Sequence, residues 1–153
     1  MMKIMRKRTG KNGFTLMELL IAVSLLAIGL LAVASMQTVA MNANMVSNRL
    51  TVATTLAQQV AEDVLSWNVF DPKLNTAIPM PAPTSPNYTF INPSTGVAST
   101  QITIPGAGTY SARYSTAPNS TVIGNTQIVI IVSYSSGSAW KDLVTYTFYK
   151  RVN

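Results

Sequence analysis

The run of residues 14–34 constrains this chain more than any other stretch of its sequence. The run holds 21 residues, and Glu18 is its only ionisable side chain. Twenty-one residues of helix span about 31 Å, which is close to the thickness of the hydrocarbon core of a bilayer. A secretory signal has a shorter apolar region and ends at a small-residue cleavage site, which this run lacks. We therefore expect a helix that crosses a membrane.

Residues 1–13 form a basic leader ahead of the apolar run. Their charged side chains are all basic, namely Lys3, Arg6, Lys7, Arg8 and Lys11. Such a leader stays on the cytoplasmic side, so we expect a single-pass membrane protein with its N-terminus inside and its C-terminal domain outside. The whole chain has a formal charge of +6, from 11 basic and 5 acidic residues. Without the leader the basic and acidic residues nearly balance, which argues against a nucleic-acid partner.

The carboxylate of Glu18 is out of place in a plain membrane anchor. A charged carboxylate costs roughly 2.5–3.5 kcal/mol at the bilayer centre, and less near a helix N-terminus, where the dipole favours an anion. If the chain is cut after Gly13, Phe14 becomes the N-terminus and its amine lies one helical turn from Glu18. An amine and a carboxylate in an apolar medium favour pairing, within one chain or between neighbours. We therefore expect Glu18 to make a contact that aligns subunits in an assembly.

The sequence GFTLME at residues 13–18, with the basic leader and the apolar run, resembles the class III signal of type IV pilins and pseudopilins. The resemblance implies that a prepilin peptidase cuts between Gly13 and Phe14 and that the amine of Phe14 is methylated. It also implies that Glu18, the fifth residue of the mature chain, acts in assembly. The implied location is the inner membrane, with the C-terminal domain in the periplasm or outside, and later a cell-surface pilus. The implied partners are the prepilin peptidase, the lipid bilayer before assembly, the inner-membrane assembly platform, and other pilin subunits, major and minor, bundled through their helices.

Features of about the first 67 residues resemble, more narrowly, the PilV-type minor pilins, also called type IV pilus modification proteins. These features are AIGLL at 27–31, SMQ at 35–37, Ala40, Asn42, Asn44, LAQ at 56–58 and Glu62. Ser35 stands where main-subunit pilins typically have a helix proline, which PilV-type proteins also lack. The resemblance implies a minor pilin that primes or caps the filament. The alternatives are a type II secretion pseudopilin and, from another class, an adhesin or DNA-binding module displayed on a pilus.

The apolar pattern becomes amphipathic over residues 35–67. Apolar side chains recur there at spacings of three or four, at Val46, Leu50, Ala53, Ala57, Val60, Val64 and Trp67. This spacing predicts that the helix continues and that a folded domain covers one stripe of it. Glu62 and Asp63 are expected on a solvated face of the helix.

Residues 68–100 are expected to form a connecting loop. They contain six prolines, at positions 72, 79, 81, 83, 86 and 93. Because proline is excluded from helix interiors and central strands, we expect neither a helix nor a central strand between residues 71 and 96.

Residues 101–153 predict an antiparallel β-sheet domain. Candidate strands cover residues 88–91, 101–104, 109–114, 127–134 and 143–150. Five consecutive β-branched residues at 128–132 predict a strand covered on both faces. The last two strands predict a hairpin, and its aromatic side chains are expected in the sheet core: Tyr134, Trp140, Tyr146, Phe148 and Tyr149. The expected fold is α+β and type IV pilin-like. Its long N-terminal helix is transmembrane in the first half, amphipathic in the second, and packs on the small sheet.

The chain has no histidine and no cysteine. It therefore has no Ser-His-Asp triad, no thiolate nucleophile and no imidazole or thiolate metal site. The acids outside the helix, Asp71 and Asp142, are too few for a convincing active site. We expect a structural protein and not an enzyme, with no catalytic residue, cofactor or metal.

Overall fold

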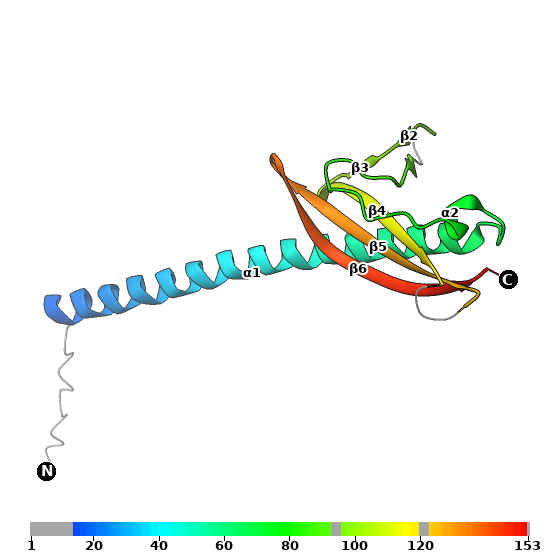
Figure 1. Ribbon diagram of the computed structural model, residues 1–153. Coiled ribbons are helices and arrows are strands. Elements are labelled where there is room, and N and C mark those ends of the chain that lie inside the picture. Colours follow the sequence, from blue (N-terminus) through cyan, green and yellow to red (C-terminus); the bar gives the residue numbers. More distant parts are fainter. Residues whose placement is uncertain (1–13, 93–95, 120–122, 153) are drawn as a thin grey trace, which may run out of the picture. The chain divides into compact units, whose positions relative to one another are not determined.

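The computed structural model describes residues 14–92, 96–119 and 123–152 (Figure 1). Its elements are α1 Leu16–Ser66, α2 Pro72–Asn75, β1 Phe90–Ile91, β2 Ala98–Ser99, β3 Gln101–Ile104, β4 Gly108–Pro118, β5 Asn125–Ser136 and β6 Ala139–Arg151. A long N-terminal apolar helix is thus followed by antiparallel strands. The predicted α+β, pilin-like fold class is confirmed.

The chain divides into two compact units, Met1–Asn42 and Ala43–Asn153, and the border between them falls within α1. In the described part of the first unit, α1 carries hydroxyl side chains inside its apolar stretch. Ser24 donates to the carbonyl oxygen of Leu20 at 2.8 Å, and Ser35 to that of Ala32 at 2.9 Å. These hydroxyl groups therefore find partners inside the helix itself, which suits an environment without water.

In the second unit, α1 has a buried stripe beneath the sheet. Its members are Ala53, Leu56, Ala57, Val60, Ala61 and Val64. The stripe begins later than the apolar spacing predicted, because Val46 and Leu50 remain exposed. Helical periodicity indicates which face of a helix is apolar, but not how far along it a sheet extends.

The main sheet has four antiparallel strands in the order β3-β4-β5-β6. The predicted hairpin is confirmed: Ser136 pairs with Ala139, and Gly137 takes a positive φ of 68° in the turn between them. The pairing of β5 with β6 shifts by one residue after Val132, and this β-bulge leaves Leu143 without an opposite residue.

One face of β5 packs in the core that includes the α1 stripe. Ile128, Ile130 and Val132 are fully buried on that face, whereas Val129 and Ile131 on the other face are half-buried. The prediction of a strand covered on both faces is therefore wrong for the second face. The connector reaches the outer side of the sheet only locally, for example where Pro81 accepts a hydrogen bond from Arg113.

The connector also differs from the predicted loop. Residues 72–75 form the short helix α2, in which Pro72 takes the first helical position and needs no N–H partner. Asp71 caps this helix, because its carboxylate accepts the N–H of Lys73 at 2.9 Å. The expectation of no helix between residues 71 and 96 is therefore wrong at this site. Residues 90–91 and 98–99 pair as the small sheet β1-β2, so the predicted strand 88–91 is shorter and the expected loop contains two strands.

Candidate assembly site at the start of the first helix

The first turn of α1 is capped by Thr15. The Oγ1 atom of Thr15 accepts the N–H of Glu18 at 3.3 Å, and its carbonyl oxygen accepts the N–H groups of Glu18 and Leu19 at 3.1 and 3.2 Å. Threonine followed three residues later by glutamate is the spacing of a capping box. Thr15 and Glu18 therefore mark the start of α1 in the sequence itself. The cap places Glu18 in the first helical turn, where the helix dipole favours its negative charge.

Phe14 and Glu18 are both exposed, and Phe14 retains 82% of its accessible surface. Within the described ranges the structure contains one ion pair, between Arg113 and Asp142, so the Glu18 carboxylate has no cationic partner there. Gly13 lies outside the described residues. Cleavage between Gly13 and Phe14, methylation of Phe14 and the assembly role of Glu18 therefore remain predictions.

The apolar side chains of α1 are uncovered on every side through the first unit. Those exposed by half or more between residues 16 and 36 are Leu16, Met17, Leu19, Leu20, Ile21, Val23, Leu25, Leu26, Ile28, Leu30, Leu31, Val33 and Met36. A helix that is apolar all round requires lipid or other helices around it. By length and composition, α1 is also suited to cross a membrane.

The capped acid and the uncovered apolar helix can now be compared with known proteins. Residues 8–34 match the Prokaryotic N-terminal methylation motif. No curated protein and no solved structure matches the chain. The motif match spans Gly13, Phe14 and Glu18 and supports a type IV pilin-like or pseudopilin subunit. For a pilin-like chain, the apolar helix and this signal indicate membrane anchoring followed by assembly with other pilin subunits.

The other end of α1 is held by a side chain from the sheet. The last turn of α1 has no basic residue of its own. Instead, the ammonium group of Lys150 in β6 donates to the carbonyl oxygens of Val64, Leu65 and Trp67 at 3.1, 2.7 and 2.5 Å. Burial lowers the pKa of Lys150, and the charge of Asp71 opposes that shift. A cation here satisfies carbonyl groups that the helix leaves unpaired at its end.

Asp63 is exposed, as the sequence predicted, but its carboxylate also has a partner in the connector. Its carboxylate accepts the phenol O–H of Tyr88 at 3.2 Å and so ties α1 to the connector. Burial first, and then the charge and hydrogen bond of Asp63, raise the pKa of Tyr88 to about 12. The neighbouring Glu62 is exposed, and its carboxylate has no partner in the part of the chain that the structure describes.

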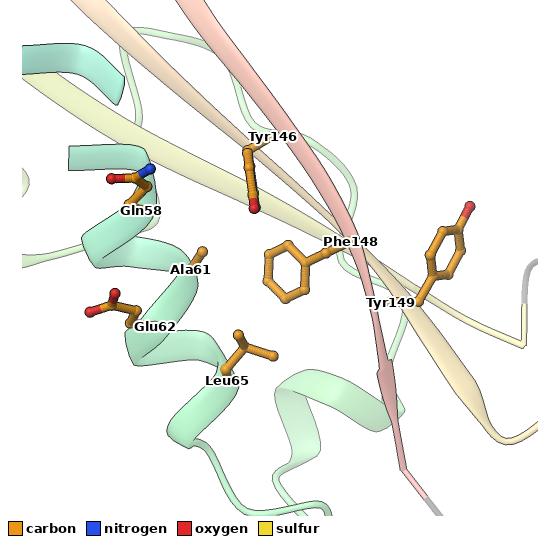
Figure 2. A pocket seen from close by; sticks show the side chains of 7 residues that line it. All are labelled: Gln58, Ala61, Glu62, Leu65, Tyr146, Phe148 and Tyr149. Carbon is orange, nitrogen blue, oxygen red and sulfur yellow. The ribbon is translucent and has the colours of Figure 1, made fainter. Parts of the chain in front are cut away.

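The aromatic side chains of the hairpin divide between core and surface. Tyr134 and Phe148 pack against the core, but Tyr146 and Tyr149 are about half exposed, so the prediction that all five lie in the sheet core is wrong. Tyr146 and Phe148 have ring centroids 5.9 Å apart and line a groove beside α1 (Figure 2). Tyr146 and Phe148 are two residues apart and lie on one face of β6, but β6 is an edge strand whose inner face α1 covers only in part.

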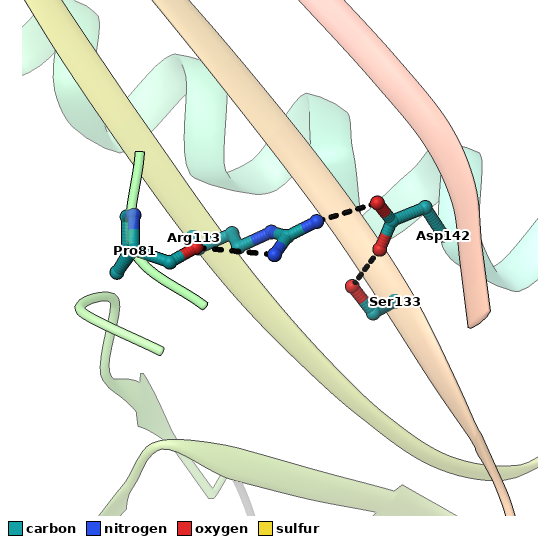
Figure 3. Close-up of polar contacts among 4 residues, drawn as sticks. All are labelled: Pro81, Arg113, Ser133 and Asp142. Atoms are coloured by element: carbon teal, nitrogen blue, oxygen red, sulfur yellow. Dashed lines mark hydrogen bonds and ion pairs between the residues drawn. The ribbon is translucent and has the colours of Figure 1, made fainter. Parts of the chain in front are cut away.

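A charged network crosses the outer face of the sheet (Figure 3). The nearly buried Arg113 donates to the carbonyl oxygen of Pro81 at 3.1 Å and pairs with Asp142 at 2.5 Å. The other carboxylate oxygen of Asp142 accepts the hydroxyl of Ser133 at 2.7 Å. The network thus joins the connector, β4, β5 and β6, although the Nε atom of Arg113 is buried without a hydrogen-bond partner in the described part of the chain. Among the described residues, no group of three metal-binding side chains comes together.

Proposed function

We propose that this chain is a prepilin that matures into a minor pilin of the PilV type. The observation that carries the proposal is the match of residues 8–34 to the methylation motif, over a helix with uncovered apolar side chains. In the proposed maturation, a prepilin peptidase cuts between Gly13 and Phe14, and the amine of Phe14 is methylated. The leader holds the N-terminus in the cytoplasm, and the mature chain waits in the inner membrane as a single-pass protein. An assembly platform then adds it to a pilus.

Glu18 is the residue proposed to guide entry into the filament. Its carboxylate is exposed in the first turn of α1 and is unpaired in the described part of the chain. In hydrocarbon, a lone carboxylate or ammonium group is strongly disfavoured. The Glu18 of an incoming subunit therefore attracts the terminal amine of Phe14 on a neighbour. Once this pair forms, the surrounding apolar side chains are in register with those of the neighbouring helix.

The mass of the mature protein tests the maturation step. We expect a protein that begins at Phe14 and carries one added methyl group. If the protein keeps residues 1–13 in cells that process their other prepilins, the proposal is wrong and the chain is a membrane-tethered domain.

Three substitutions of Glu18 separate its pairing role from its place in the helix cap. Glutamine fits a capping box as well as glutamate does, but it has no charge. We therefore expect both Glu18→Gln and Glu18→Ala to be cleaved normally and to enter filaments at least tenfold less than the parent, measured by immunoblotting of sheared pili. Glu18→Asp, which keeps the charge, should recover part of the incorporation. Normal incorporation of Glu18→Gln would contradict the pairing role.

The minor role rests on the resemblance of residues 27–62 to PilV-type proteins, and Ser35 in place of the helix proline supports it. We expect few copies per filament and far fewer filaments in a deletion strain, as a priming or capping subunit requires. A type II secretion pseudopilin is the second candidate, because the methylation motif favours it equally. Deletion that abolishes protein secretion but leaves pili intact would decide for the pseudopilin.

A further inference from the structure

A cavity of about 190 Å³ lies between the β5–β6 hairpin and the first turns of α1 in the second unit. Arg49 lies over the ring of Tyr134, with its guanidinium carbon 4.4 Å from the ring centroid. Lys141 of β6 lines the same cavity, is exposed, and has no hydrogen-bond or ion-pair partner within the described ranges. Val46 and Leu50 line it with exposed apolar side chains. The cavity thus combines two cations with uncovered apolar surface.

The two cations of this cavity have no carboxylate beside them. No acid is among the described residues that line the cavity. The guanidinium group of Arg49 has a neutral partner, because its Nη2 atom donates to the sulfur atom of Met45 at 3.1 Å. Asp142 follows Lys141 in the chain, but its carboxylate pairs with Arg113. The positive charge of the cavity is therefore left for an anion from outside the chain.

The position of Arg49 in the sequence matches the width of a membrane. No ionisable side chain occurs at residues 19–48, between Glu18 and Arg49. A helix of that length measures about 45 Å, which is close to the thickness of a bilayer with both of its headgroup layers. When the apolar run anchors the chain, Arg49 is therefore the first charged residue that reaches the outer headgroup layer, and the cavity that it lines lies at the same level.

We propose that this cavity binds the phosphate group of an anionic phospholipid in the outer leaflet of the membrane that anchors the chain. Arg49 and Lys141 bind the phosphate oxygens, since basic side chains next to a membrane span are attracted to anionic lipids. Val46 and Leu50 contact the apolar part of the lipid beside the headgroup. Tyr134 suits this level, because aromatic rings with a polar end gather at the headgroups. The inference rests on the proposed function, because it concerns the mature chain waiting in the membrane, and it adds a lipid site on the folded domain.

Fluorescence quenching in vesicles tests this contact in a chain that has no cysteine of its own. Ser138→Cys in the full-length chain carries a fluorescent label in the hairpin turn, at an exposed residue that does not line the cavity. A small share of the lipids carries a nitroxide on the headgroup, which quenches a label that lies close to it. We expect several-fold more quenching in an equal mixture of phosphatidylglycerol and phosphatidylcholine than in phosphatidylcholine alone. Ser85→Cys, at an exposed site on the connector, is the matched control and should be quenched equally in both.

Neutral variants on the Ser138→Cys chain then test the two cations. Arg49→Gln and Lys141→Gln should each reduce the gain from phosphatidylglycerol several-fold. Arg151→Gln is the matched control, because it removes the same charge from an exposed site of β6 outside the cavity, and it should keep the gain. Equal quenching of the parent in the two kinds of vesicle would overturn the inference and favour an acidic protein segment as the occupant. Equal losses in all three variants would also overturn it, because they would show attraction by net charge alone.

The mass of the mature chain is measured in cells and does not depend on this contact. A protein that starts at methylated Phe14 but is quenched equally in both kinds of vesicle would sink this inference and leave the proposed function standing. Retention of residues 1–13 in cells would contradict the proposed function, whatever the quenching.

Discussion

The two parts of α1 share one secondary structure and have opposite surroundings. In residues 16–42 the described structure buries no side chain, and the apolar side chains are exposed all round. Between Ala53 and Val64, six side chains are buried beneath the sheet. Both parts are therefore helical, and they differ in what covers their apolar side chains. The second part is covered by its own domain, whereas the first part needs lipid or other subunits.

This contrast separates two consequences of mutation. A substitution in the second part removes contacts that the chain makes with itself, so it lowers the free energy of unfolding. A substitution in the first part removes contacts with other molecules, so it changes assembly and leaves the fold intact. Predictions for the two parts can therefore be paired.

The largest expected difference comes from one buried and one uncovered side chain. Ile130 is fully buried in the centre of β5, so Ile130→Ala should lower the free energy of unfolding by about 2–5 kcal/mol. Leu26 is 62% exposed in the first part of α1, so Leu26→Ala should change it by no more than about 0.5 kcal/mol. Urea unfolding of the full-length chain in detergent, followed by tryptophan fluorescence, measures both. Equal losses in the two variants would show that the two parts of α1 do not differ as described.

A smaller effect is expected at the end of the second part. Lys150→Met removes the donor to three helix carbonyl groups and should lower the free energy of unfolding by about 1–3 kcal/mol. Arg151→Met is the matched control, because Arg151 is exposed one residue further on and should tolerate the change. Hydrogen exchange should become faster at residues 60–66 in Lys150→Met and stay unchanged at residues 20–40. Faster exchange in both regions would mean that the first part also depends on the sheet.

The smallest effect concerns the link between α1 and the connector, and it depends on pH. The pKa of Tyr88 is raised from 10.0 to about 12 in the folded chain. The unfolded chain therefore loses this proton first, so stability that is present below pH 10 is lost as the pH rises through about 12. In Tyr88→Phe, the free energy of unfolding should therefore fall by up to about 2 kcal/mol less as the pH rises. Burial also raises the pKa of Tyr110 and Tyr114, so part of the loss should remain. An identical alkaline profile in the variant would show that the raised pKa of Tyr88 is not a source of this loss.

Much of the fold could be predicted from the sequence, because the residues that determine it lie close together in the chain. The unbroken helix, the strand at residues 101–104 and the final hairpin follow from periodicity, proline placement and turn residues. Two local signals were available and not used: threonine and glutamate three residues apart at the start of α1, and aspartate before proline at the start of α2. At the candidate site, the sequence identified Phe14 and Glu18 through the motif, and the structure added the Thr15 cap that holds Glu18 in the first turn.

The remainder was not predictable, because it depends on residues far apart in the chain. Nothing near Arg113 indicates that it pairs with Asp142, which lies 29 positions later. Similarly, the apolar spacing of α1 could not show that Val46 and Leu50 stay uncovered, because the reach of the sheet is set by strands that follow much later.

The bond from Lys150 to Val64 spans 86 residues and has a consequence for the order of folding. Contacts that close long loops are slow to form, because the entropy of the loop is lost before the contact stabilises the chain. We therefore expect the end of α1 to be completed only when β6 docks against it. We expect a refolding chain to pass through a stage with a frayed end of α1, so that a protease added early in refolding cuts near Ser66 more readily than it does in the folded chain.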